Sequence, residues 1–324
     1  MSTPEVLGLF STPNMAWSII INLFSVVLTI LTVASFIPQL RRICSLSSSA
    51  DITIVQLLLI LICATEHFTI FFLFLVNSGM PSNISHLPTT AGDWLNLTHV
   101  TVVWVMFFVL FCLTLHYKRR YKSCTTFLSV IFYIAFLLIS VFPLFLDATT
   151  DAFQNPNQLG ERILAVVMFM GAHCLYIHPL VSSLGFLSVL FQLWSVFRPS
   201  DRALSLRSLV VQSAVFALTG LSWIVRLNVL SKPPSAGEGE HNEDSGSENA
   251  VFIWYAALWW PVVDYLGFAA IQGILLAVAL YRRRRARMAA GTGVGKDGEE
   301  GEEGEALLGE EIDLEDRERW RGVR

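Results

Sequence analysis

Long apolar runs separated by short polar stretches set the pattern of this chain. A membrane-spanning helix needs about 20 apolar residues, and seven runs reach that length. They lie at 17–40, 52–76, 95–117, 124–146, 163–197, 204–230 and 251–281. The fifth run is too long for one straight span, and we expect His178-Pro179 to divide it. The pattern predicts an all-α polytopic membrane protein with seven transmembrane helices.

The composition agrees with a chain built for lipid. Apolar residues make up 54% of the 324 positions and charged residues only 15%, whereas a soluble domain carries about 25% charge. We expect no signal peptide, because residues 1–16 lack a basic start and contain Pro4 and Pro13. None of the five cysteines lies in a segment that we place outside the cytosol, so we expect no structural disulfide.

Positive charge alternates from loop to loop. Lysines and arginines follow the first, third, fifth and seventh runs, whereas the loops at 77–94, 147–162 and 231–250 are acidic or nearly free of basic residues. Because cytosolic loops carry the excess of positive charge, we place the N-terminus outside or in a lumen and the C-terminus in the cytosol. The triplet Asn83-Ile84-Ser85 then lies in an outer loop, where Asn83 is a candidate for glycosylation.

The segment 282–324 differs from the rest of the chain. A basic block, "RRRRAR", is followed by a stretch rich in glycine and glutamate. Such a composition predicts a disordered cytosolic tail whose basic block contacts anionic lipid headgroups. Glu303 followed by Leu307 and Leu308 has the form of an acidic dileucine sorting signal, which would engage a sorting adaptor.

Two stretches, 31–59 and 184–211, resemble each other. Leu31, Ser35, Gln39 and Leu40 match Leu184, Ser188, Gln192 and Leu193, and after a one-residue gap 51–54 lies over 203–206. Internal repeats in a membrane chain are typical of transporters. The repeat predicts a three-plus-one-plus-three arrangement. Its parts are an outer segment 1–16, a first repeat 17–117, a linker helix 118–150 and a second repeat 151–281.

The stretch "PQLRRICSLSSSADITI" resembles the PQ-loop motif of a family that includes cystinosin, vacuolar and lysosomal amino-acid exporters, the SWEET sugar carriers and the KDEL receptor. The resemblance covers about residues 17–281 and implies seven helices in the same arrangement, with the N-terminus outside. It also implies hinges at Pro38 with Gln39, and at Gln192. The second motif departs from the pattern, since Phe191 replaces the proline, so we expect the first half to move more. Without the resemblance, Pro38 and Gln39 would simply mark a helix end.

Two acidic residues lie inside the predicted spans, where ionisable groups are costly and usually have a role. Glu66, in the second helix, is a candidate for proton coupling, because low dielectric favours its neutral form and lets it load and release a proton. The alternative is a paired structural acid. Its neighbour His67 points about 100° away on the helix, and we interpret it as a packed histidine or part of a site wall.

The second acid, Asp264, follows a tryptophan-rich stretch in the seventh helix. By the family resemblance it would bind a substrate amine or a proton; the alternative is an acid that pairs beside the Pro261 kink. Trp259 and Trp260 are candidates for the wall of the site or for an interfacial belt.

Other chemistry is not favoured by the sequence. His173 and His178 are five residues apart, which is poor spacing for one helical face, so we expect no metal site. We find no nucleophile elbow or phosphate loop, and expect neither an enzyme nor a cofactor nor a nucleic-acid partner.

The sequence therefore predicts a secondary carrier of a small polar solute, with proton-coupled amino-acid export across a vacuolar or lysosomal membrane as the leading function. A non-transporting receptor of the same family and a sugar uniporter are the alternatives. The expected partners are the solute, protons and the bilayer, and the sequence leaves the oligomeric state open.

Overall fold

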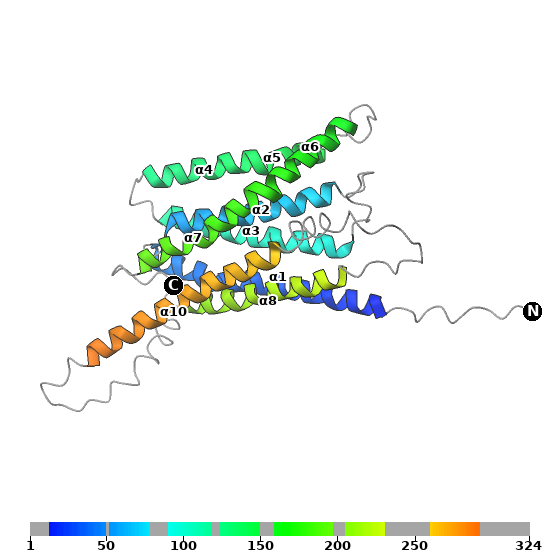
Figure 1. Cartoon of the computed structure of the whole chain (residues 1–324). Helices are drawn as coiled ribbons and strands as arrows, with labels where there is room; N and C mark the ends of the chain where they lie inside the picture. Colours follow the sequence, from blue (N-terminus) through cyan, green and yellow to red (C-terminus); the bar gives the residue numbers. More distant parts are fainter. Residues whose placement is uncertain are drawn as a thin grey trace, which may run out of the picture. The chain divides into compact units, whose positions relative to one another are not determined.

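The computed structural model describes residues 13–49, 52–77, 90–117, 124–149, 159–196, 205–230 and 260–291 (Figure 1). These residues are almost entirely helical, and none of them forms a strand. Several predicted functional positions lie outside the described residues: Asn83, Trp259, Glu303, Leu307 and Leu308.

Ten helical segments follow one another along the described part of the chain. They are α1 (Pro13–Leu46), α2 (Ile54–Val76), α3 (Ala91–Tyr117), α4 (Cys124–Ser140), α5 (Phe142–Thr149), α6 (Leu159–Ala172), the π-helical turn η3 (His173–Ile177), α7 (His178–Val196), α8 (Leu206–Leu230) and α10 (Trp260–Gly291). Helices α4 and α5 form one span, and α6, η3 and α7 form another. The result is seven spans that are long and apolar enough to cross a membrane, which confirms the predicted all-α, seven-helix membrane fold.

Contacts along the chain define a large unit, Met1–Ala279, and a smaller one, Leu280–Arg324. In the large unit α2 is the most enclosed span, because 67% of the residues in its most apolar stretch are buried. It packs against α3, α4, α5, η3 and α7, while α1 packs against α3 and α8. Exposed apolar side chains such as Ile30, Phe132 and Leu180 cover the outward faces of α1, α4 and α7, as expected for surfaces that meet lipid. In the smaller unit, 280–291 is the helical end of α10.

The two prolines flagged in the sequence behave differently. Helix α1 runs through Pro38 to Leu46, so the helix is not broken there. The fifth span is divided as expected, because α6 gives way to η3 and α7 begins at His178. Pro179 has no N–H to donate to the carbonyl of Leu175, so a regular α-helical bond cannot form at this point. Just before the proline, the N–H of His178 donates to the carbonyl of His173. This acceptor lies one residue further back than Cys174, the acceptor in a regular α-helix.

Helix α10 approaches its neighbours closely at glycines. A Cβ on Gly220 of α8 would lie 2.9 Å from Leu266 Cγ and 3.3 Å from the Leu266 backbone nitrogen. Contacts this short cannot be relieved by a side-chain rotation alone, because the backbone of α10 is one of the partners. A Cβ at position 220 would therefore force Leu266 and the backbone of α10 to shift.

We predict that Gly220→Ala lowers the free energy of unfolding by about 1–3 kcal/mol, since overpacking a filled contact costs this much. Gly185→Ala is the matched control, because its Cβ would lie at an ordinary 3.7 Å from Cys63 Cβ. Unfolding in detergent measures both. Equal stability of the two variants would contradict the close approach of α8 and α10.

Candidate functional site

Two buried glutamines tie helix ends together across the large unit. The side-chain oxygen of Gln39, on α1, accepts a hydrogen bond from the backbone N–H of Ser205 at 2.8 Å. The side-chain oxygen of Gln192, on α7, accepts from the N–H and the hydroxyl of Thr53 at 3.0 and 2.9 Å. Ser205 and Thr53 immediately precede α8 and α2. Each glutamine therefore satisfies a donor at the start of a helix, where the backbone N–H groups have no intrahelical partner.

The two hydrogen bonds join equivalent positions of the sequence repeat. Gln39 aligns with Gln192, and the same alignment lays Thr53 over Ser205. The glutamine of each repeat thus bonds the helix start of the other repeat. The hydroxyl of Ser208 adds a bond to the carbonyl of Ser35, again between α8 and α1. Gln39 and Gln192 thus make equivalent contacts, and we call these contacts, Gln39 with Ser205 and Gln192 with Thr53, the glutamine latches.

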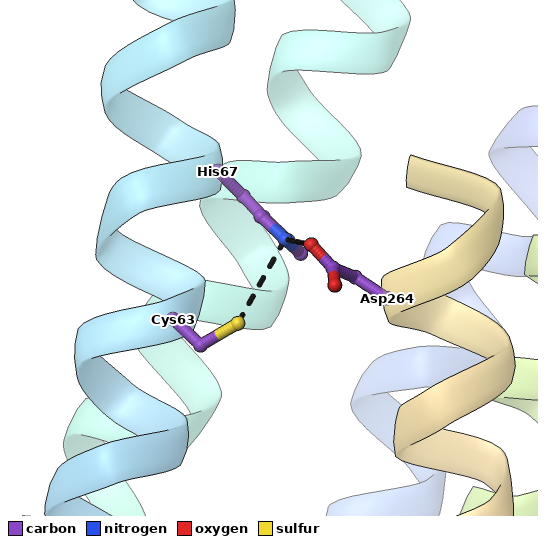
Figure 2. Close-up of side chains that lie close together, drawn as sticks. All are labelled: Cys63, His67 and Asp264. Atoms are coloured by element: carbon purple, nitrogen blue, oxygen red, sulfur yellow. Dashed lines mark hydrogen bonds and ion pairs between the residues drawn. The ribbon is translucent and has the colours of Figure 1, made fainter. Parts of the chain in front are cut away.

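A carboxylate and two histidines meet in the interior of the same unit. Asp264 Oδ2 lies 2.5 Å from His67 Nε2 on α2 and 3.2 Å from His178 Nε2 on α7. The hydroxyl of Ser182 donates to the same oxygen at 3.1 Å. All four side chains are buried. Figure 2 shows His67 reaching from α2 towards Asp264 on α10, with Cys63 one turn away on α2. We call Asp264, His67, His178 and Ser182 the aspartate cluster.

Helical periodicity explains how α7 and α2 supply this cluster. His178 and Ser182 are four residues apart on α7 and share a face, as do Cys63 and His67 on α2. Two faces that each carry a pair of polar groups therefore converge on one carboxylate. His67 is packed against the rings of Trp260 and His178, and it also hydrogen-bonds Asp264. The sequence did not predict this second contact, because Asp264 lies 197 positions away and local spacing does not relate the two residues.

Trp260 lies against the aspartate cluster. Its ring centroid is 4.8 Å from that of His67 and 4.9 Å from that of His178, and Phe71 packs against the same indole at 5.2 Å. Trp260 is buried, so its indole belongs to the interior. An aromatic face beside a carboxylate suits a cationic nitrogen, which both groups attract.

Glu66 has a partner of its own. Its Oε1 lies 2.7 Å from His173 Nδ1 in η3, while its Oε2 is buried with no hydrogen-bond partner. Phe169 stacks on the His173 ring at 4.1 Å. Glu66 is thus a buried carboxylate with a hydrogen bond at one oxygen only. It is next to His67 in the sequence, but its partner is His173, whereas Asp264 contacts His67 and His178.

The π-helical turn places both histidines of the fifth span towards α2. The expectation that residues five apart would face different ways assumed α-helical spacing throughout. In η3 the backbone bond runs from residue i+5 to residue i, so His173 and His178 lie one turn apart. Ser182, His173 and His178 are the functional candidates that sequence reasoning missed or set aside. The sequence feature that could have indicated them is three polar residues, five and four positions apart, in an apolar segment next to Pro179.

Metal binding is possible in principle at one set of side chains. Donor atoms of Cys63, His67 and Asp264 lie within 4.8 Å of one another. Two ligands of one zinc ion, each about 2.0–2.2 Å from the metal, would be separated by roughly 3.3 Å in a tetrahedral site. The 2.5 Å between His67 and Asp264 is instead the distance of a hydrogen bond. His67 and Asp264 therefore form a hydrogen-bonded pair in this arrangement.

No protein-family model, curated protein or solved structure matches the chain. What the site can do therefore follows from its geometry alone. It offers two separate buried carboxylates, each paired with histidine.

We predict that Asp264→Ala destabilises the protein by about 1–3 kcal/mol more than Asp264→Asn does, because alanine leaves the buried groups of His67, His178 and Ser182 without their acceptor. The asparagine retains a side-chain oxygen and serves as the matched variant. Denaturant unfolding of the purified protein measures the difference. Equal effects of the two substitutions would show that the hydrogen bonds to Oδ2 contribute nothing to stability.

Proposed function

We propose that this chain is a secondary carrier of a small polar solute, coupled to protons, and that its cargo is an amino acid exported across a vacuolar or lysosomal membrane. One observation carries the proposal: ionisable side chains from α2, α7 and α10 meet in the core of a seven-helix membrane protein. Such groups are expensive in a bilayer and mark substrate pathways and proton relays. The predicted repeats assign α2 to one half of the carrier and α7 and α10 to the other.

The glutamine latches support a carrier that alternates between two states. They connect the two predicted halves at one end, the end that loop charge assigns to the cytosol. Carriers built from repeats expose a central site to either side by rocking one half against the other. Breaking both latches would open the cytosolic end, since helix-end donors can be satisfied by entering water.

The chemistry of the site supports protons and an amine as its ligands. Asp264 accepts three hydrogen bonds or ion pairs, and an ammonium group carries the donors and the charge to replace them. Glu66, with one free oxygen, is placed to accept a proton independently. A neutral sugar would not need either carboxylate, and a receptor would need no latches that open, so the carrier accounts for more of the structure than its alternatives.

We predict that the double variant Glu66→Gln with Asp264→Asn loses at least tenfold of the uptake driven by an imposed pH gradient. Neither amide can bind and release a proton in the relevant range. The assay uses proteoliposomes and a mixture of radiolabelled amino acids. Glu161→Gln is the control, because Glu161 lies exposed in the first turn of α6. Unchanged uptake in the double variant would remove the proton role, and binding of amino acids without uptake would favour a receptor.

We predict that Gln39→Leu and Gln192→Leu each raise the rate at which a thiol reagent, added from the cytosolic side, modifies Cys63. The background variant has alanine at the other four cysteines, and Cys63 is buried beside the aspartate cluster. A hydrogen bond contributes about 0.5–1.5 kcal/mol, which corresponds to roughly two- to twelvefold per latch.

Gln212→Leu is the control for the latches, since the side-chain nitrogen of Gln212 is buried without a hydrogen-bond partner. It should leave the modification rate of Cys63 unchanged. If the latch variants behave like Gln212→Leu, the glutamines do not close the cytosolic end.

A further inference from the structure

Two neighbouring residues of α2 contact two histidines of the fifth span. Glu66 pairs with His173 at the start of η3, and His67 shares Asp264 with His178 at the start of α7. The rings of His67 and His178 are 5.7 Å apart. The segment that separates the two histidines is the π-helical turn itself. Any change in this turn therefore changes the relation between the two carboxylate sites.

The two contacts can coexist only because of the turn. In an α-helix, five residues advance by roughly 500°, which leaves two side chains about 140° apart. In η3 the i+5 to i hydrogen bond makes the same five residues close one turn. If η3 relaxed to α-helical bonding, α6 would rotate by about 100° relative to α7. His173 and His178 could then not both face α2.

We propose that η3 is the element that couples Glu66 to the aspartate cluster, with His173 and His178 as its two positioning residues. The π form holds His173 on Glu66 and His178 on Asp264. When Glu66 takes up a proton, the charge-assisted bond to His173 is lost, the turn relaxes, and His178 withdraws from Asp264. The proposal deepens the proposed function, because it names the residues through which the proton acts on the solute site.

The surroundings of the turn allow this movement. The side chains of Leu175 and Tyr176 are 45% and 74% exposed, so η3 can rearrange without emptying the core. The Glu66 carboxylate is held by His173 at Oε1, whereas its Oε2 has no hydrogen-bond partner. A short segment with one buried contact at each end and an exposed middle is suited to switching between two backbone forms.

The titratable groups that face the two carboxylates come from several elements. Cys63 on α2 and Cys174 in η3 lie near enough to Glu66 to interact with its charge, in addition to His173. Cys63 also faces Asp264, together with His67 and His178. From the remaining neighbours, Tyr133 on α4 hydrogen-bonds Thr65 of α2, and His99 on α3 packs against Tyr265 of α10. The coupling is assigned to the histidines because His173, at the start of η3, contacts Glu66, and His178, directly after η3, contacts Asp264. Ser182 also contacts Asp264, but from one turn further along α7.

Deletion of Tyr176 tests whether η3 has to change its backbone form during transport or only has to keep the two histidines in place. Removing one residue turns the π turn into an α turn in which His173 and the former His178, now at position 177, are four positions apart and still share a face. The contacts of the two histidines with Glu66 and Asp264 are kept, but the turn can no longer alternate between a π-helical and an α-helical form.

We expect the deletion variant to fold and to lose at least tenfold of pH-driven amino-acid uptake in the proteoliposome assay. Tyr176→Leu, which keeps the length of the turn and an apolar side chain, should retain uptake. Normal uptake by the deletion variant would overturn the proposal.

A second measurement needs neither a known solute nor the deletion. In the background that retains only Cys63, modification rates are compared at pH 5 and pH 7.5 for the parent, Glu66→Gln, His173→Gln and the double variant, each as a ratio to the parent at the same pH. If His173 conveys the state of Glu66, the three variants should give the same ratios. Ratios that multiply in the double variant would show independent action and overturn the proposal, even where the deletion variant fails to fold. If the parent takes up no amino acid, the proposed function fails while this comparison still decides the coupling.

Discussion

A carboxylate in the core of a membrane protein has to be surrounded by donors, and this requirement organises the centre of the molecule. Asp264 meets it with groups from two other helices, His67 on α2 and both His178 and Ser182 on α7. The three helices are therefore held in one register by charge and hydrogen bonding as well as by apolar packing. It is consistent that α2, which carries both Glu66 and His67, is also the most enclosed span.

Buried hydrogen-bonding groups at helix ends also need partners, and the glutamine latches supply them. The N–H groups of Thr53 and Ser205 precede helices, and each is satisfied by a glutamine from a distant part of the chain. A bond of this kind differs from the aspartate cluster in one respect. Water can replace it at a helix end, whereas water entering the cluster would have to replace several buried contacts at once. The molecule thus combines hydrogen bonds at helix starts, which water can replace, with a strongly paired centre, and the proposed alternating carrier would use this combination.

The π-helical turn connects these features to the backbone. Pro179 cannot donate a hydrogen bond to the carbonyl of Leu175, and the turn just before it is π-helical, with one residue more than an α-helical turn. That extra residue decides the orientation of His173 relative to His178, and so which carboxylate each of them meets. The π-helical geometry of this one turn therefore determines that His173 contacts Glu66 while His178 contacts Asp264.

The sequence by itself determined the number of spans, the break before Pro179, the two acids inside the membrane and the alignment of Gln39 with Gln192. Each of these follows from local patterns, since hydropathy, proline chemistry and repeat spacing act over one or two helical turns. Tertiary structure alone decided the partners. His67 and Asp264 are separated by 197 positions, and Gln39 and Ser205 by 166, so no periodicity relates them. The spacing argument against His173 and His178 failed for the same reason, because it assumed 3.6 residues per turn where packing and a proline produced another helix geometry.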